Sequence, residues 1–242
     1  MDLFLFYLYA YLIGSVPTGY LLGLWIRKVD IRKYGSGNVG TSNVFIHIGK
    51  RWGILLGATE FLLKGASPVW IGLLILDLPV QESSGPFLAD FLFGFHRDSF
   101  HLVGAALLAL AGNNWSIFLK FKGGRGLAVA GGGLSTMALY ECLICCVVSL
   151  LGYLFLKIPA GIITLVCLLL LPFWVIVFGQ TTSVLCYCLG VNALVLIKRL
   201  LGSEELFPDS VSKPRLLLTR LIFDRDLMDR DAWVKKVPQS QR

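Results

Sequence analysis

The 242-residue chain contains 56% hydrophobic residues and only 15% charged residues, and its mean hydropathy is +0.73. A typical soluble domain carries about 25% charged residues, so this composition excludes a soluble globular domain and predicts an integral membrane protein. The formal net charge of +7 does not indicate nucleic-acid binding, because the basic residues cluster beside apolar segments. That distribution is typical of cytoplasmic loops that contact anionic lipid headgroups.

The first apolar segment, residues 3–26, is long enough to cross a bilayer. No basic region precedes it and no clear small-residue cleavage site follows it, so we interpret it as a retained span and not as a signal peptide. A Gly/Pro break over residues 14–19 interrupts this span, which is tolerated where the freed backbone faces protein or water. Ser15 and Thr18 are therefore candidates to line a pocket, with a simple kinked helix as the alternative.

The loop that follows, Arg27 to Arg51, is basic and contains a glycine-rich stretch from residue 30 to residue 43. We expect its glycines to adopt positive φ, so that successive backbone N–H groups point into one concavity. Short polar side chains and cations surround these glycines, a combination that suits a phosphate. A flexible basic loop that only sets membrane topology is the alternative. The glycines are Gly35, Gly37 and Gly40, and the short donors are Ser36, Asn38, Thr41, Ser42 and Asn43.

A second span is expected over residues 52–76, and it carries Glu60 and Lys64. Ionisable residues inside a membrane segment are costly, and they face a partner or a polar interior. These two side chains are four residues apart and share a helix face, so they can pair. A purely structural ion pair is one interpretation and a role at a polar site is the other. The polar loop 78–99 has a negative balance and is assigned to the outer side.

A third span, residues 100–119, leads into a second basic, glycine-rich loop, Lys120 to Gly126. Further spans are expected over residues 126–140, 141–157, 161–178 and 182–197. The fold class is therefore an all-α integral membrane protein with about seven transmembrane helices. With both basic loops on the cytoplasmic side, this odd count places the N-terminus outside and the tail inside.

We divide the chain into a membrane domain, residues 1–200, and a basic cytoplasmic tail, residues 201–242. Within the tail, residues 216–223 suggest an amphipathic helix on the membrane surface, with a partly ordered tail as the alternative. The six cysteines all lie in apolar segments, so packing is favoured over metal binding or redox chemistry. They are Cys142, Cys145, Cys146, Cys167, Cys186 and Cys188.

The two glycine-rich loops meet the same membrane face, where they can form one anion site at the lipid–water boundary. A substrate with a phosphate and an acyl chain fits such a site, with the phosphate in the loops and the chain between helices. Acyl transfer then requires a held donor, a positioned hydroxyl and cations that stabilise the developing negative charge.

Four segments together resemble the bacterial acyl-phosphate glycerol-3-phosphate acyltransferases. They are residues 14–20, residues 30–44 (similar almost residue for residue), Leu63-Lys64-Gly65, and residues 121–126. The resemblance covers roughly residues 10–205. It implies a seven-span enzyme of the bacterial inner membrane that transfers an acyl group from acyl phosphate to the 1-hydroxyl of glycerol 3-phosphate, without metal or cofactor.

The resemblance also implies the site residues. Ser36, Lys122 and Arg125 are the expected catalytic residues, with arginine at position 125 where lysine is usual. The expected substrate-binding residues are Gly37, Asn38, Gly40, Asn43, Lys64, Gly123 and Gly124.

At several positions the sequence departs from the family pattern. Ile46 stands where an arginine is usual, Asn113 replaces a histidine, and Ala193 and Leu196 replace a histidine and an asparagine. An aspartate is usual at Phe61, beside Glu60, and His47 lies beside Ile46. A catalytically reduced paralogue that binds an anionic lipid or regulates a partner enzyme is therefore the second hypothesis. A transporter is the third, although transporter sites usually lie at the bilayer midplane. The sequence predicts no oligomeric state and no acyl-chain preference.

Overall fold

The computed structural model describes residues 2–78, 97–202 and 213–224, and the regular elements of these residues are all helical. Five described helical segments are long and apolar enough to cross a membrane: Leu3–Arg27, Lys50–Ile75, Ser99–Leu119, Ala160–Val177 and Thr182–Leu201. Two shorter apolar helices, α8 (Leu127–Met137) and α9 (Leu139–Leu154), lie between the third and fourth of them. The predicted all-α membrane architecture is confirmed. Of the predicted polar loop 78–99, residues 79–96 lie outside the described residues, and residues 97–99 belong to a helix instead.

The first span consists of α1 (Leu3–Ser15), α2 (Thr18–Leu22) and the π-helical turn η1 (Gly23–Arg27). The break predicted from the Gly/Pro sequence falls between α1 and α2, at Val16 and Pro17. Gly14 precedes this break, and a Cβ on Gly14 would collide with the carbonyl oxygen of Ala109. This glycine therefore allows α1 to pack directly on α7 (Arg97–Asn114).

The second span also changes its helical geometry. It runs through α4 (Lys50–Thr59), the π-helical segment η3 (Glu60–Ala66) and α5 (Ser67–Ile75). Glu60 and Lys64 both lie in η3 and are buried. Because π-helical segments are rare and occur frequently at functional sites, η3 marks a region of interest.

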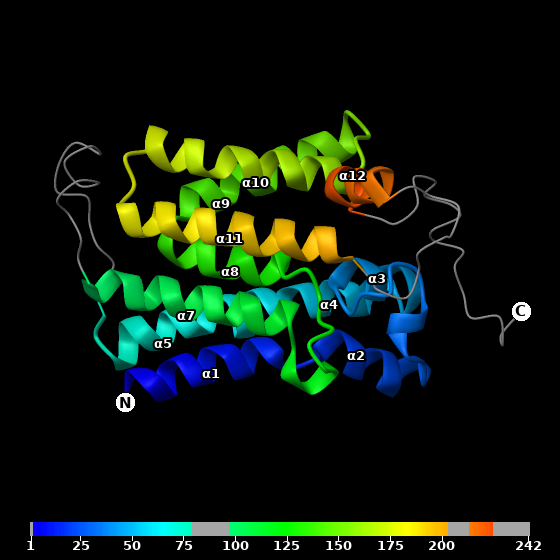
Figure 1. Cartoon of the computed structure of the whole chain (residues 1–242), viewed down its shortest axis with the longest axis horizontal. Coiled ribbons are helices and arrows are strands. Elements are labelled where there is room, and N and C mark those ends of the chain that lie inside the picture. Colours follow the sequence, from blue (N-terminus) through cyan, green and yellow to red (C-terminus); the bar gives the residue numbers. More distant parts are fainter. Residues whose placement is uncertain (1, 79–96, 203–212, 225–242) are drawn as a thin grey trace, which may run out of the picture.

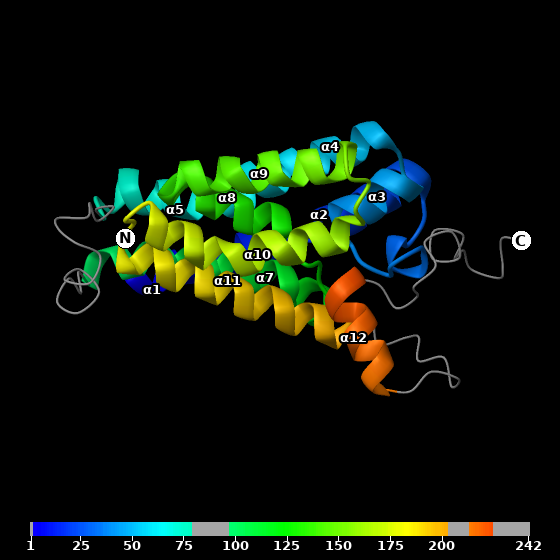
Figure 2. The same cartoon turned by 90° about the horizontal axis from the view of Figure 1, so that it is seen from above.

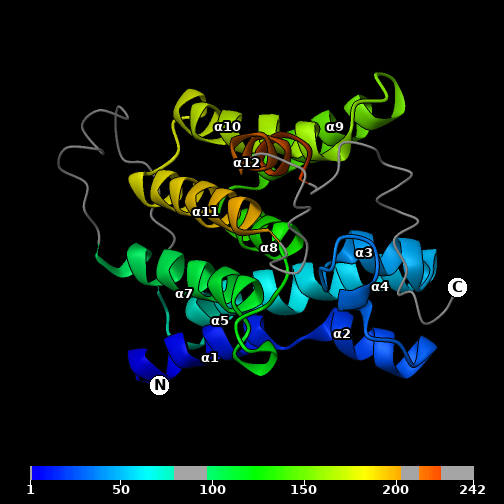
Figure 3. The ribbon, with the colours of Figure 1, turned by 45° about the vertical axis from the view of Figure 1, so that its right-hand side comes forward.

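The helices run along the long axis of the molecule and stack in layers (Figures 1 and 3). One layer contains α1, α5 and α7. The next contains α8 and α11 (Thr182–Leu201), and α9 and α10 (Ala160–Val177) cover it. The largest apolar cluster of the described residues includes side chains of α7, α8, α10 and α11. Within it, the fully buried Tyr187 donates a 2.8 Å hydrogen bond to the carbonyl oxygen of Ala130. Outward-facing apolar side chains such as Leu74 and Phe155 are exposed, as expected for a surface that lipid covers.

Four short helical elements of the described chain lie in the connecting and terminal segments. The first basic loop contains a 3₁₀ turn, η2 (Ile31–Lys33), and α3 (Thr41–His47). A second 3₁₀ turn, η4 (Ile117–Leu119), follows α7. In the tail, α12 (Lys213–Phe223) occupies the segment for which the sequence suggested an amphipathic helix. It lies beside the ends of α10 and α11 that are far from the N-terminus (Figure 2).

The contact between η3 and α8 depends on two glycines. A Cβ on Gly132 would collide with the carbonyl oxygen of Phe61 and lie 2.8 Å from Cα of Gly65. Both obstacles are main-chain atoms. A Cβ on the neighbouring Gly131 would instead meet the edge of the Phe61 ring at 3.3 Å, and a side chain can move.

We therefore expect Gly132→Ala to destabilise the protein by about 1–3 kcal/mol, the usual cost of overpacking. Gly131→Ala is the matched control and should cost much less. Thermal unfolding of both variants in detergent measures the difference. Equal stability of the two variants would contradict the proposed close packing of η3 on α8.

Candidate active site

The first glycine-rich loop is folded around one buried amide. Nδ2 of Asn43 donates to the carbonyl oxygens of Ile31 at 3.1 Å, Tyr34 at 3.0 Å and Asn38 at 2.8 Å. Asn43 is only 1% exposed. Since the amide binds three successive parts of the loop, Asn43 holds the loop in a closed conformation.

Two of the three loop glycines have the conformation that we expected. Gly35 and Gly37 adopt φ values of 50° and 68°, where other residues are strained. A Cβ on Gly35 would also lie 2.5 Å from Nε2 of His47 and 2.6 Å from Oδ1 of Asn43. Gly40 was predicted wrongly, because its φ is −78° and it occupies the N-cap position of α3. No atom lies within 4 Å of the Cβ that a larger residue would place there.

The second glycine-rich loop folds back on the end of α7. The N–H groups of Gly123 and Gly124 donate to the carbonyl oxygens of Asn114 at 3.2 Å and Asn113 at 2.9 Å. A Cβ on Gly123 would collide with the carbonyl oxygen of Asn113. Glycine is therefore required for the close approach of this loop to α7, and the loop in turn places Arg125 beside the start of α8.

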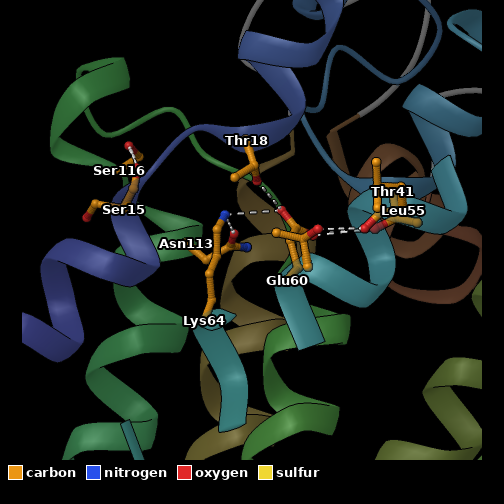
Figure 4. A network of polar contacts seen from close by, with 9 residues as sticks. Ser15, Thr18, Thr41, Leu55, Glu60, Lys64, Asn113 and Ser116 are labelled. Atoms are coloured by element: carbon orange, nitrogen blue, oxygen red, sulfur yellow. Dashed lines mark hydrogen bonds and ion pairs between the residues drawn. The ribbon is translucent and has the colours of Figure 1, made fainter. Parts of the chain in front are cut away.

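A buried polar network connects the first span, the second span and α7 (Figure 4). Nζ of Lys64 donates to Oε1 of Glu60 at 3.2 Å and to Oδ1 of Asn113 at 3.1 Å. The hydroxyl groups of Thr18 and Thr41 donate to the two carboxylate oxygens of Glu60 at 3.3 Å and 3.4 Å. Asn113, which replaces the usual histidine of the family pattern, thus accepts a hydrogen bond from a buried cation.

Ser15, the other candidate beside the first-span break, takes no part in this polar network. The carbonyl oxygen of Ser15 accepts a 2.5 Å hydrogen bond from the hydroxyl of Ser116. The Ser15 hydroxyl is buried and has no hydrogen-bond partner among the described residues. Ser15 and Thr18 therefore lie beside the break, and Thr18 reaches the polar network through Glu60.

A cavity of about 170 Å³, the polar cavity, lies between the first loop, η3 and the start of α8. It contains Ser36 and Arg125, two of the residues expected to be catalytic. Its full lining is Ser36, Asn38, Gly40, Thr41, Ser42, Asn43, Gly57, Glu60, Asn113, Arg125, Gly126, Leu127, Ala128 and Asp224. Hydroxyl groups, amides and one guanidinium line this small space together with the carboxylates of Glu60 and Asp224, each of which is paired with a cation. The hydroxyl, amide and guanidinium groups are donors of the kind that bind a phosphate.

A second cavity of about 490 Å³, the basic cavity, lies between the two loops and the end of α11. Asn38 lines both this cavity and the polar cavity. Lys122, the third expected catalytic residue, lies here and does not line the polar cavity. The full lining is Asp30, Arg32, Lys33, Gly37, Asn38, Trp115, Leu119, Lys120, Phe121, Lys122, Gly123, Lys198, Leu201 and Gly202.

Part of the positive charge of the basic cavity is held in place by local contacts. Nε and Nη2 of Arg32 donate to the two carboxylate oxygens of Asp30 at 2.9 Å and 2.7 Å. This hydrogen-bonded guanidinium lowers the pKa of the Asp30 carboxyl. Nζ of Lys198 lies 5.5 Å from the centre of the Trp115 ring, a cation–π contact.

A third cavity of about 590 Å³, the apolar cavity, lies among α8, α9, α10 and α11. It shares Leu127 and Ala128 with the polar cavity, so the two cavities adjoin. Leucines, Phe61, Tyr187 and four of the six free cysteines line it. The sequence analysis placed an acyl chain between helices but did not identify these residues.

Two departures from the family pattern line a cavity, Asn113 the polar cavity and Phe61 the apolar cavity. The other three lie elsewhere. Ile46 is 39% exposed, Ala193 is exposed, and Leu196 is half-buried. None of the three lines the polar or the basic cavity. Lys64 and Gly124, which we expected to bind substrate, do not line either cavity, whereas the remaining expected residues do.

His47 packs beneath the first loop, where its ring lies 5.8 Å from that of Tyr34. Its Nε2 is buried and has no hydrogen-bond partner among the described residues. Burial lowers the pKa of His47, because the charged ring is the form that desolvation penalises.

The protein should therefore lose stability as the pH falls below about 6.5, where an unfolded histidine takes up a proton and the folded one does so only at lower pH. We expect the unfolding temperature to fall between pH 7.5 and pH 5.5, and to fall less in His47→Gln. Ser135→Ala, which alters a hydroxyl bonded within α8, should retain the full pH dependence. An unchanged pH dependence in His47→Gln would exclude this role.

The Glu60–Lys64 pair should be sensitive to the loss of one partner, because its side chains are only 6% and 3% exposed. We expect Glu60→Gln or Lys64→Met to cost about 3–5 kcal/mol and the double variant to cost less than the sum. The half-exposed Asp30–Arg32 pair is the control, and Asp30→Asn should cost about 1 kcal/mol or less. Additive costs at positions 60 and 64, measured by thermal unfolding, would show that the two charges are not coupled.

Three comparisons with known proteins agree with this geometry. A family model described as glycerol-3-phosphate acyltransferase matches residues 4–202. The chain is 31% identical over 238 residues to glycerol-3-phosphate acyltransferase 4 of Dehalococcoides mccartyi strain CBDB1, covering 94% of this chain and 90% of that protein. It is 30% identical over 213 residues to the glycerol-3-phosphate acyltransferase of Endomicrobium trichonymphae, covering 88% and 96%.

The fold also matches a solved structure, the glycerol 3-phosphate form of PlsY (YgiH), an integral membrane glycerol 3-phosphate acyltransferase. The TM-score is 0.67 at 25% sequence identity, and the match covers 81% of this chain and 88% of that one. The family model and a relative matched over nearly the whole chain lead to one conclusion. This chain belongs to the glycerol-3-phosphate acyltransferase family.

Proposed function

We propose that this membrane acyltransferase transfers an acyl group from acyl phosphate to the 1-hydroxyl of glycerol 3-phosphate and so forms lysophosphatidic acid for phospholipid synthesis. The observation that carries the proposal is the junction of two cavities of opposite character. The polar cavity with Ser36 and Arg125 adjoins the apolar cavity at Leu127 and Ala128. An acyl phosphate has the same two parts, a charged group and an apolar chain.

In this arrangement the acyl chain occupies the apolar cavity and the reacting carbonyl lies near Leu127 and Ala128. The hydroxyl of Ser36, which accepts a 3.3 Å hydrogen bond from the N–H of Asn38, lines the polar cavity and contacts a phosphate oxygen of the substrate. Arg125 offsets the negative charge that develops on the acyl phosphate. The basic cavity, with Lys33 and Lys122, attracts the doubly charged glycerol 3-phosphate.

The reaction requires no residue that forms a covalent intermediate. The hydroxyl oxygen of glycerol 3-phosphate attacks the acyl carbon, a new ester bond forms, and the bond between this carbon and the phosphate oxygen breaks. The phosphate leaves and takes the hydroxyl proton, which is reasonable for a group whose second pKa is about 6. Glu60 already accepts hydrogen bonds at both oxygens, so we assign it a structural role in the cavity wall.

The comparisons favour this enzyme over a reduced paralogue, and the cavities beside the connecting loops do not favour a midplane transporter site. We place the protein in the bacterial inner membrane, in contact with lipid, with both glycine-rich loops and the tail on the cytoplasmic side. The clustering of basic residues in these segments supports that orientation. The division into a membrane domain and a basic tail stays a prediction.

Purified protein in detergent, supplied with palmitoyl phosphate and labelled glycerol 3-phosphate, should form lysophosphatidic acid. Ser36→Ala and Arg125→Ala should each lower kcat/KM roughly 10- to 150-fold, because one charge-assisted contact to a phosphate contributes about 1.5–3 kcal/mol. The matched controls are Ser135→Ala and Arg51→Ala, which alter a hydroxyl bonded within α8 and an exposed cation of α4. The kcat/KM of both control variants should remain within about twofold of the wild-type value.

Folded protein that forms no product would contradict the proposed activity. Full activity of Ser36→Ala and Arg125→Ala would instead contradict the assignment of the polar cavity as the active site. The two results are distinguishable, because the first concerns the wild-type chain and the second only the variants.

A further inference from the structure

The tail helix α12 is attached to the membrane helices by two buried arginines. Nη1 of Arg199, on α11, donates to the carbonyl oxygens of Gly161 at 3.1 Å and Leu221 at 3.0 Å. Nη1 of Arg220, on α12, donates to the carbonyl oxygens of Leu200 at 3.2 Å and Leu201 at 3.1 Å. Each helix therefore binds main-chain oxygens at the end of the other.

Two glycines allow this close approach. A Cβ on Gly161 would collide with the carbonyl oxygen of Phe223, the last residue of α12. A Cβ on Gly202 would collide with the guanidinium of Arg220, and Gly202 has a φ of 57°. With Arg199 and Arg220 only 1% and 3% exposed, α12 is a packed part of the structure and its end has a defined position.

The residue after α12 reaches the polar cavity. Oδ2 of Asp224 lies 2.6 Å from Nη1 of Arg125, and Oδ1 lies 3.5 Å from Nε of Arg199. The Asp224 side chain is 12% exposed. Asp224 lines the same cavity as Ser36 and Arg125, although residue 224 lies beyond residues 4–202 that the family model matches.

We propose that Asp224 is a positioning residue, which holds the guanidinium of Arg125 in the orientation that binds the phosphate of the substrate. This inference rests on the proposed function, because it assigns Arg125 to a phosphate. A guanidinium has five N–H donors in a planar fork, so a carboxylate at one terminal nitrogen leaves other donors for a phosphate. Lysine, which is usual at this position in the family, has a single ammonium group and not a planar fork of donors that could bind a carboxylate and a phosphate side by side.

The charges around the polar cavity support a positioning role for Asp224. They argue against the alternative, in which Asp224 competes with the phosphate for Arg125. Arg199 lies on the other side of Asp224 with a side chain that is 0% exposed. Asp224 therefore bridges two cations, and a phosphate that displaced it would leave a buried arginine without its anionic partner, which is costly. A bridge that remains in place restricts the rotamers of Arg125, a long side chain that otherwise loses entropy when substrate binds.

The test is the binding of palmitoyl phosphate, whose phosphate we assign to Arg125, to the full-length protein in detergent, measured by calorimetry without glycerol 3-phosphate. Asp224→Asn keeps the shape of the side chain and removes its charge. We expect it to weaken the binding of palmitoyl phosphate about tenfold, and to raise KM for palmitoyl phosphate more than it lowers kcat. Arg215→Gln, at an exposed position of α12, is the matched control and should bind as wild type does.

A double-variant cycle separates positioning from a general effect on structure. In the Arg125→Ala background, Asp224→Asn should cause no further loss of binding, because the group that it positions is gone. An equal loss in both backgrounds, or binding by Asp224→Asn that is as tight as or tighter than wild type, overturns the inference. Asp224→Glu, which restores the charge, should recover part of the affinity.

The outcome for the proposed function is read separately. Wild-type protein that binds palmitoyl phosphate but transfers no acyl group to glycerol 3-phosphate refutes the activity, while the binding cycle still decides the role of Asp224. Wild-type protein that binds neither palmitoyl phosphate nor inorganic phosphate overturns both.

Discussion

The buried contact between Glu60, Lys64 and Asn113 is the interaction on which the other features of the site depend. Charges inside a membrane segment are tolerated only where they have partners, and here the partners come from distant parts of the chain. Thr18 belongs to the first span, Thr41 to α3, and Asn113 to α7. One ion pair therefore fixes the positions of the helices and the first loop that surround the polar cavity. Both of its charged residues belong to the π-helical segment η3.

The two glycine-rich loops are rigid for different reasons. The first is closed by the amide of Asn43, which binds three carbonyl oxygens at once. The second is bound through its main chain to the end of α7. Sites built on rigid elements keep their donors aligned before substrate arrives, which is the main requirement when catalysis consists of positioning and charge stabilisation. The buried glycines in these loops are therefore structural requirements as well as features of a phosphate-binding sequence.

The polar and basic cavities are lined by polar and charged groups although the chain lacks several polar residues that are usual in the family. Ile46, Ala193 and Leu196 lie away from the polar and basic cavities, so their replacement does not place apolar groups there. At the position where a histidine is usual, Asn113 accepts a hydrogen bond from Lys64. Meanwhile α12, outside the segment that the family model matches, contributes Asp224 beside Arg125. The site thus combines a family loop with a residue from the tail.

The membrane class, the approximate span boundaries, the break in the first span and the two basic, glycine-rich loops can be predicted from the sequence alone. These are local properties, since a hydrophobic length of about 20 residues and a glycine-rich run are visible in a short window. Only the tertiary structure placed Lys122 and Arg125 in different cavities, bonded Lys64 to Asn113, and brought Asp224 to Arg125. Those contacts join residues 49 and 99 positions apart. Helix packing decides them, and periodicity along the chain contains no information about which distant side chains meet.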